Sequence, residues 1–144
     1  MKHYVKIFGM LTALVMALSC SKKNDDDPVV DVIGGTWNLT SAIGNTKFDY
    51  KQTITFKTTD SSFIKTYENG DESKTAKGKF SIRIESRSDT NFIFVSLKYN
   101  EISSLIQYCY KEQLREEYFV NQKDSELIGT WGICDGPTYI YNKK

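Results

Sequence analysis

The sequence predicts an all-β protein, an antiparallel up-and-down barrel of eight or nine short strands. Two observations carry this prediction. Apolar and polar residues alternate with a period of two through much of the chain after residue 31, as they do in strands with one buried face. Turn-forming residues interrupt these runs at short intervals, so neighbouring strands are joined locally. A meander of this kind loses its exposed edges by closing on itself.

The first strands show the alternation most clearly. In "TWNLTSA", Trp37 and Leu39 lie on the face opposite Asn38 and Thr40. The pair Asn69-Gly70 follows "FIKTY" and is a strong hairpin signal. The run "FDYKQTITFK" is polar on one face, and its other face carries Phe48, Tyr50, Gln52, Ile54 and Phe56.

The later runs continue the pattern. "KFSIRIE" places Phe80, Ile82 and Ile84 on one face, whereas "NFIFVSLKY" is apolar on both faces and indicates a better covered strand. "DGP" breaks the chain before the last run, "TYIYNK". The expected strands are 35–42, 47–57, 61–68, 74–85, 91–99, 104–111, 115–121, 126–134 and 138–142.

Residues 101–120 are ambiguous. Ile102, Leu105, Ile106 and Leu114 approach a helical stripe, and "EQLREE" contains good helix formers. In the same segment, "IQYCYK" alternates as a strand does, and "YFV" also favours a strand. We expect strands at 104–111 and 115–121, with a short helix near 101–118 as the alternative.

The N-terminus reads as a secretory signal. A basic opening precedes an apolar run at 7–17, which is shorter than the about 20 residues that a membrane-spanning helix needs. "ALSC" resembles a bacterial lipobox, which implies that Cys20 becomes the lipidated first residue of the mature chain. The expected organisation is a signal peptide at 1–19, a lipidated and acidic tether at 20–30, and a barrel domain at 31–144. The protein would then be lipid-anchored at the outer membrane, facing the periplasm or the cell surface.

Removing residues 1–19 changes the chemistry available to the protein. The chain's single histidine, His3, is lost with Lys2 and Lys6, while all 18 acidic residues remain, so the formal charge is close to zero. Such a surface gives no electrostatic case for nucleic acid. Without histidine there is no Ser-His-Asp or Cys-His pair and no imidazole ligand for a metal. We expect a non-catalytic protein without cofactor or metal, and interpret Glu116-Glu117 as part of a solvated face.

Two cysteines, Cys109 and Cys134, remain after lipidation of Cys20. The alternation turns both outward, and the expected strand at 115–121 lies between them. Two strand spacings amount to about 9.5 Å, beyond the about 7 Å between Cα atoms that a disulfide can bridge. We therefore expect two free thiols.

The ends of the domain resemble a known family. "VIGGTWNLTSA" is similar to the G-x-W opening strand of lipocalin-like domains, and "PTYIYNK" resembles their closing strand. The resemblance implies an up-and-down barrel of the calycin type. It also implies that Trp37 packs under the barrel floor against a basic residue from the last strand, for which Lys143 is the candidate.

An eight-stranded barrel encloses either side chains or one small ligand. Gln52 interrupts an apolar face, which indicates either a polar handle in a cavity or simply a position near the barrel mouth. Tyrosines crowd the C-terminal third and would offer stacking surfaces to a sugar or a partner protein: Tyr99, Tyr108, Tyr110, Tyr118, Tyr139 and Tyr141. The candidates for the interior and for ligand contact are Trp37, Leu39, Tyr50, Gln52, Ile54, Phe56, Phe80, Ile82, Ile84, Trp131 and Ile133.

Two functions from different classes fit these features. The first is a lipid-anchored binding module of the cell envelope that holds a small hydrophobic or glycan ligand. The second is a packed-core barrel that acts as an interaction or structural component by docking another envelope protein. A cavity with a polar group favours the first, and a filled interior beside an exposed aromatic patch favours the second.

Overall fold

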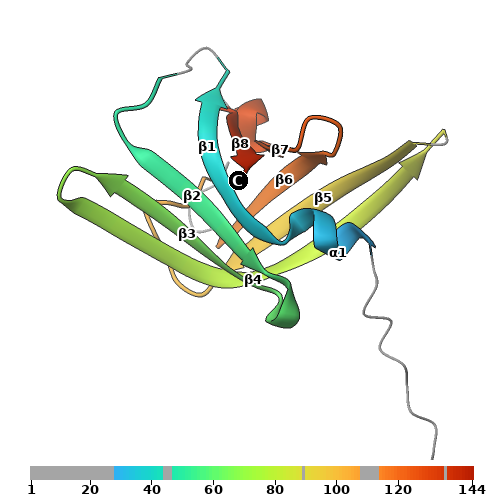
Figure 1. Cartoon of the computed structure of the whole chain (residues 1–144), viewed down its shortest axis with the longest axis horizontal. Helices are drawn as coiled ribbons and strands as arrows, with labels where there is room; N and C mark the ends of the chain where they lie inside the picture. The colour runs from blue at the N-terminus through green and yellow to red at the C-terminus, as the bar shows by residue number, and fades with distance from the viewer. Residues whose placement is uncertain (1–27, 44–46, 89, 108–113, 135) are drawn as a thin grey trace, which may run out of the picture.

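The computed structural model describes residues 28–43, 47–88, 90–107, 114–134 and 136–144 (Figure 1). A short helix precedes a series of strands. In chain order the elements are α1 (Pro28–Ile33), β1 (Gly35–Ala42), β2 (Lys51–Lys57), the 3₁₀ helix η1 (Thr58–Asp60), β3 (Ser62–Asn69), β4 (Glu72–Arg87), β5 (Thr90–Tyr99), β6 (Arg115–Asn121), β7 (Glu126–Gly129), the 3₁₀ helix η2 (Trp131–Cys134) and β8 (Tyr139–Lys143).

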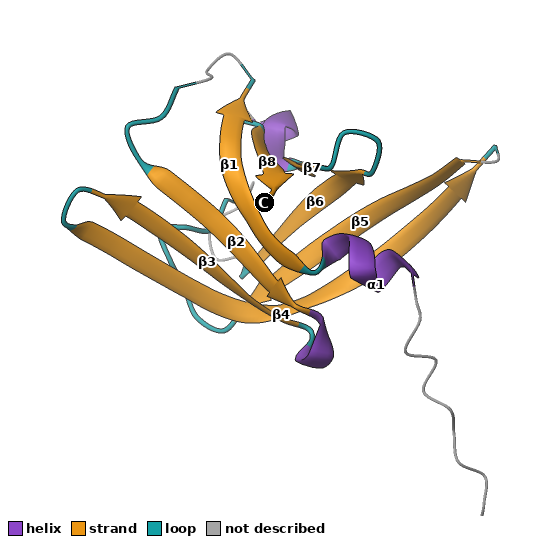
Figure 2. Cartoon of the chain, in the orientation of Figure 1, coloured by secondary structure: helices purple, strands orange, loops and turns teal. Residues whose placement is uncertain are grey.

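The eight strands form one closed antiparallel barrel. Each strand pairs with the next along the chain, and β8 pairs with β1 (Figure 2). The predicted fold class, an all-β up-and-down barrel, is therefore confirmed in its eight-stranded form. The expected strands at 35–42 and 115–121 coincide with β1 and β6, and the other observed strands begin or end within a few residues of their expected positions except at 104–111 and 126–134.

Residues 101–120 hold one strand, β6, where we expected two. Of the expected strand 104–111, residues 104–107 form a turn followed by irregular backbone, and 108–111 lie outside the described residues. The alternative, a short helix near 101–118, is also wrong where the chain is described, because 101–107 contain no helix and β6 begins at Arg115. The apolar spacing has another cause: Leu105 and Ile106 are buried in the barrel core.

The run expected as a strand at 126–134 divides in two. β7 ends at Gly129, and the chain then turns through η2. The indole ring of Trp131 folds back onto Gly129, where a Cβ would overlap the ring. A small residue there allows Trp131 to reach the barrel core instead of continuing the strand.

The expectation of two free thiols is wrong, because Cys134 is disulfide-bonded. The expected distance of about 9.5 Å between Cys109 and Cys134 holds only if Cys134 lies on a regular strand. Cys134 instead lies in η2, so the strand spacing does not apply to it. The other cysteines of the chain, Cys20 and Cys109, lie outside the described residues.

Helix α1 covers one end of the barrel. Ile33 is fully buried, and the Trp37 Nε1 donates a hydrogen bond to its carbonyl oxygen at 2.9 Å. The Lys143 Nζ lies 5.8 Å from the Trp37 ring centroid and donates to the carbonyl oxygens of Asp31 and Val32 at 3.1 and 2.8 Å. The contact that we expected between Trp37 and Lys143 is confirmed, and it ties the first and last strands to α1.

One candidate for the interior, Ile84, is 47% exposed, so its placement inside the barrel was wrong. Ile84 pairs with the buried Ile93 on β5, but the pairing of β4 with β3 ends at Lys79. Beyond that point β4 pairs with β5 alone among the described strands, so Ile84 lies on a two-stranded extension of the sheet. Figure 1 shows the paired ends of β4 and β5 projecting from the barrel wall.

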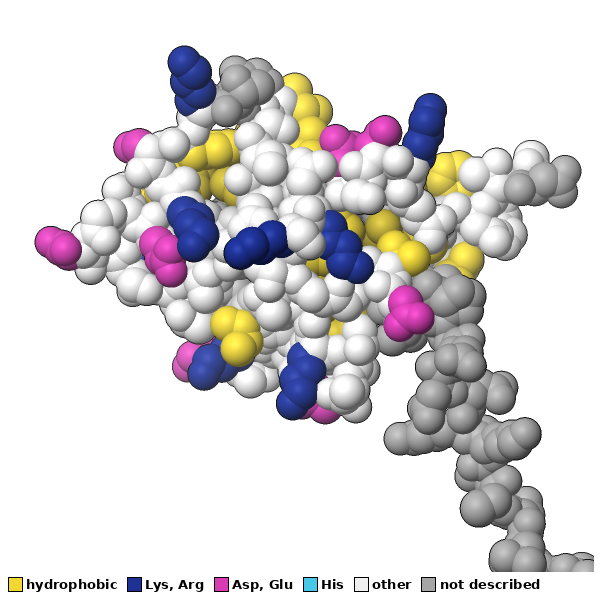
Figure 3. Space-filling model, in the orientation of Figure 1, with side chains coloured by type: hydrophobic (Ala, Val, Ile, Leu, Met, Phe, Trp, Pro, Cys, Tyr) yellow, Lys and Arg dark blue, Asp and Glu magenta, His cyan; other side chains and the backbone are white. Residues whose placement is uncertain are grey.

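The outer surface carries charges of both signs. Basic and acidic side chains are interspersed with small apolar areas on the face shown in Figure 3. In the part of the chain that the structure describes, no helix combines the length and apolar character needed to cross a membrane.

Candidate functional site

A buried ion pair lies inside the barrel. The Lys65 Nζ contacts the two carboxylate oxygens of Glu116 at 2.9 and 3.1 Å, and both side chains are fully buried. Lys65 projects inward from β3 between Phe63 and Tyr67 in the strand alternation, and Glu116 does the same from β6, before Tyr118. The barrel closure brings these residues together across 51 positions of sequence.

Hydroxyl groups complete the surroundings of the Glu116 carboxylate. The Tyr99 and Tyr118 hydroxyls donate to its Oε2 at 2.6 and 2.7 Å, and the backbone N–H of Gln107 donates to its Oε1. The Lys65 Nζ also donates to the Tyr118 hydroxyl at 3.3 Å. A buried charge pair is tolerated only when its remaining hydrogen bonds are made, and no buried side-chain N or O atom in the described residues lacks a partner.

Burial changes the ionisation of this network. Loss of solvent lowers the pKa of Lys65, and the charge of Glu116 opposes that change. Burial raises the pKa of the Tyr99, Tyr118 and Tyr141 hydroxyls far above the usual value, and the charge of Glu116 raises it further. The three phenols therefore remain protonated in the folded barrel and act as hydrogen-bond donors.

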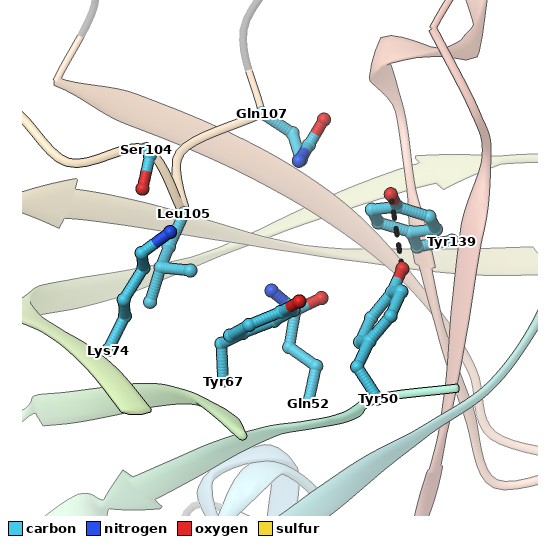
Figure 4. A pocket seen from close by; sticks show the side chains of 8 residues that line it. All are labelled: Tyr50, Gln52, Tyr67, Lys74, Ser104, Leu105, Gln107 and Tyr139. Carbon is cyan, nitrogen blue, oxygen red and sulfur yellow. Dashed lines mark hydrogen bonds between the residues drawn. The ribbon is translucent and has the colours of Figure 1, made fainter. Parts of the chain in front are cut away.

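A pocket of about 280 Å³ opens at the end of the barrel opposite α1 (Figure 4). Its side chains come from the starts of β2, β4 and β8, from β3 near its end, and from the segment after β5. They are Tyr50, Gln52, Tyr67, Lys74, Ser104, Leu105, Gln107 and Tyr139.

Aromatic rings form one wall of the pocket. The Tyr50 and Tyr67 ring centroids are 5.0 Å apart, and the Tyr50 hydroxyl donates to the Tyr139 hydroxyl at 3.5 Å. The Lys74 Nζ lies 5.6 Å from the Tyr67 ring centroid at the rim. Desolvation raises the pKa of Tyr50, so its hydroxyl also stays protonated.

Polar groups line the remainder of the pocket. The buried Gln52 accepts a hydrogen bond from the Tyr141 hydroxyl through its Oε1 at 2.9 Å. This fixes the carbonyl side of the Gln52 amide and leaves its NH₂ group on the pocket side, as Figure 4 shows. Gln52 therefore lines a pocket at the barrel mouth, and its role as a polar handle for a ligand stays a prediction.

The pocket and the buried ion pair are physically linked. Residues 104–107 contribute Ser104, Leu105 and Gln107 to the pocket, and the Gln107 N–H is bonded to Glu116. The ion pair itself has no exposure and cannot touch a molecule in the pocket. Its role toward the pocket is therefore to position the segment that lines one side of it.

The structure divides the other candidates into four groups. Tyr50 and Gln52 line the pocket, while Leu39 and Ile82 are partly buried against the core. The side chain of Ile133, and the whole of Tyr108 and Tyr110, lie outside what the structure describes. The remaining candidates are core residues, namely Trp37, Ile54, Phe56, Phe80 and Trp131.

The sequence analysis missed the ion pair. Lys65 is in phase with Phe63, and Glu116 is in phase with Tyr118 and Val120, so the alternation carried a signal for both. We treated Glu116 as solvated because its neighbours are charged. The expectation that Tyr99, Tyr118 and Tyr141 offer stacking surfaces to a sugar or a partner protein is wrong, because all three are buried.

Comparisons with protein-family models, with curated proteins and with solved structures gave no match for this chain. The function therefore has to be argued from the site. No group of three or more His, Cys, Asp or Glu side chains in the described residues is arranged to hold a metal ion.

Proposed function

We propose that this protein is a lipid-anchored, non-catalytic binding module of the cell envelope, with a lipocalin-like barrel that holds a small polar ligand such as a sugar. The observation that carries the proposal is the pocket at the barrel mouth, in which aromatic rings face amide and hydroxyl groups. Its volume is at the lower end of the range for ligand sites, so a monosaccharide is a better match than a long acyl chain.

The lining favours a glycan over a hydrophobic ligand. Tyr50, Tyr67 and Tyr139 present both ring surface and hydroxyl groups, and sugars offer apolar C–H faces and hydroxyls in return. Gln52 and Gln107 add amide donors and acceptors. Below this level buried apolar side chains of the core pack inside the barrel, which favours a ligand at the mouth over an acyl chain deep inside.

Truncating Tyr67 tests the ligand class. We expect Tyr67→Ala to weaken sugar binding roughly tenfold, because the substitution removes one aromatic wall of the pocket. Calorimetric titration of the full chain with glucose, galactose, N-acetylglucosamine and glucuronic acid measures the effect. Phe119→Ala, which removes a ring from the outer wall, is the matched control. Equal losses in both variants, or no binding of any sugar by the wild type, would contradict the proposal.

The lipid anchor is supported by the order of basic, apolar and small residues before Cys20. We expect Cys20→Ala to move the protein from the membrane fraction to the soluble fraction, or to leave an uncleaved precursor. Fractionation and intact mass report these outcomes, and Ser21→Ala, at the neighbouring position, is the matched control. An unchanged membrane fraction together with an unchanged mature mass would refute lipidation at Cys20.

A specific observation favours the second candidate, docking of an envelope protein. Four apolar residues lie directly opposite one another on the outside of neighbouring strands: Phe94, Phe119, Ile128 and Ile140. We call them the outer apolar row. Phe94 and Phe119 have ring centroids 5.8 Å apart, and every member of the row is partly exposed. Binding through this row would leave the mouth pocket unused.

A further inference from the structure

A second hollow lies on the outer wall of the barrel, away from the mouth. It has a volume of about 230 Å³ and crosses β4, β5 and β6. We call it the cationic groove, and it is lined by residues Lys79, Phe80, Ser81, Ser96, Lys98 and Arg115. The strand register places Lys98 directly opposite Lys79 on one side and Arg115 on the other.

The charged residues that line the cationic groove all have the same sign. Three cations line it, and no carboxylate does. The Lys98 ammonium forms no hydrogen bond or ion pair with any residue that the structure describes. The Arg115 Nη2 donates to the Ser96 Oγ at 2.9 Å, and the Arg115 guanidinium has no carboxylate partner among these residues. Lys98 and Arg115 therefore carry positive charges at the groove that no described carboxylate neutralises.

The nearest acidic groups are engaged elsewhere. The Glu117 Oε1 accepts from the Ser96 Oγ at 3.1 Å and pairs with the Arg83 Nη2 at 3.3 Å. The Asp60 carboxylate lies 3.8 Å from the Lys79 Nζ and 4.0 Å from the Lys57 Nζ. Like charges placed directly opposite on adjacent strands destabilise a sheet, so packing of the barrel does not explain three cations in a row.

We infer that the cationic groove binds a phosphate group. A phosphate carries about two negative charges near neutral pH and several acceptor oxygens, which match the cations of Lys98 and Arg115 and the serine hydroxyls beside them. Arg115 can donate to two of those oxygens at once, and Lys98 acts as a point charge beside it. The Ser96 hydroxyl lies at the base of the groove and is buried, while Ser81 faces it across the strand pair.

The phosphate can belong to a soluble phosphate ester or to a lipid headgroup, and the chemistry at the groove is the same. Two probe sets distinguish these sources. The first is inorganic phosphate and glycerol 3-phosphate, followed through the backbone amide signals of Ser81, Ser96 and Lys98 in NMR spectra. The second is co-sedimentation with phosphatidylcholine vesicles that contain or lack phosphatidylglycerol. Both use the full chain.

The variant Lys98→Gln/Arg115→Gln removes the two cations that have no carboxylate partner. Lys77→Gln is the matched control, because Lys77 is exposed on β4 but does not line the groove. We expect saturable shifts with the wild type and Lys77→Gln, and affinity lower by roughly tenfold or more in the double variant. Both variants remove only exposed side chains, so their far-UV spectra should match the wild type.

Three results decide the inference. Saturable phosphate binding that the double variant loses, with vesicle binding unchanged, assigns a soluble phosphate ester. Loss of phosphatidylglycerol-dependent sedimentation in the double variant alone assigns a lipid headgroup. No saturable shift with either soluble probe, together with equal sedimentation of all three proteins, overturns the inference. Sugar binding at the mouth pocket involves other residues and is unaffected by any of these outcomes.

Discussion

Replacing Lys65 by methionine is expected to destabilise the barrel by about 3–5 kcal/mol, because the change leaves the Glu116 carboxylate buried without its cation. Methionine fills a similar volume, so the loss of packing is small. Urea unfolding of the full chain, monitored by tryptophan fluorescence, gives the free energy of unfolding. Lys51→Met is the matched control, since the Lys51–Glu68 pair is exposed and worth only about 0–1 kcal/mol.

The double variant Lys65→Met/Glu116→Gln separates the charge from the hydrogen bonds. Glutamine keeps an acceptor oxygen for the Tyr99 and Tyr118 hydroxyls and removes the stranded charge. We expect the double variant to be more stable than Lys65→Met alone, so that the two substitutions are not additive. The double variant also gives a measurable free energy of unfolding if Lys65→Met alone does not fold. The account of the ion pair fails if Lys65→Met costs no more than Lys51→Met.

Raising the pH should unfold the protein cooperatively above about pH 10, the usual pKa of tyrosine. The pKa values of Tyr99, Tyr118 and Tyr141 are higher in the folded than in the unfolded chain. Their stabilising effect is therefore fully present below the unfolded pKa and is lost as the pH rises past it. Each group contributes up to about 1.4 kcal/mol per pH unit, so three together give a slope of about 4 kcal/mol per unit.

Ionisation of Lys65 changes the free energy of unfolding in the opposite direction and at lower pH. The pKa of Lys65 is lower in the folded than in the unfolded chain. The free energy of unfolding therefore increases as the pH rises toward the unfolded lysine pKa of about 10.4, and Lys65 causes no further change above that pH. Above that value the tyrosines alone determine the slope. Absorbance at 295 nm, which reports tyrosinate, should rise together with the loss of the far-UV strand signal.

The variant Tyr141→Phe removes one of the three buried phenols and should reduce the alkaline slope by about one third. The Tyr141 hydroxyl bonds Gln52 and Tyr118 and makes no hydrogen bond to Lys65 or Glu116, so the substitution leaves the contact between those two side chains in place. Gradual ionisation of all tyrosines without any loss of strand signal would show that these hydroxyls are accessible, against the structure.

Much of the barrel could be predicted because local patterns determine it. Period-two runs and turn residues place β1 to β5, and the meander follows from short connections. The ion pair could not be predicted, because the alternation places Lys65 on the inner face of its strand without indicating its partner. Glu116 becomes that partner only once β3 and β6 face each other across a closed barrel.

The errors have similar non-local causes. Ile84 keeps the inward phase of β4, but its exposure depends on where β3 begins. The position of Cys134 depends on Trp131 folding back onto Gly129, which interrupts a run that alternates normally in sequence. The mouth pocket combines Tyr50 and Gln52, which the pattern indicated, with Tyr67, Lys74 and residues 104–107, which only the closed barrel brings alongside them.

Hydrogen exchange with and without a bound sugar tests the central claim, that a small polar ligand occupies the mouth of the barrel, most directly. We predict slower exchange at residues 50–52, 67 and 104–107, where the pocket lining lies, with the Gln107 amide among the strongest effects. Amides of the outer apolar row at 94, 119, 128 and 140 should exchange as in the free protein. Protection confined to that row, or no change at the mouth at saturating sugar, would contradict the account.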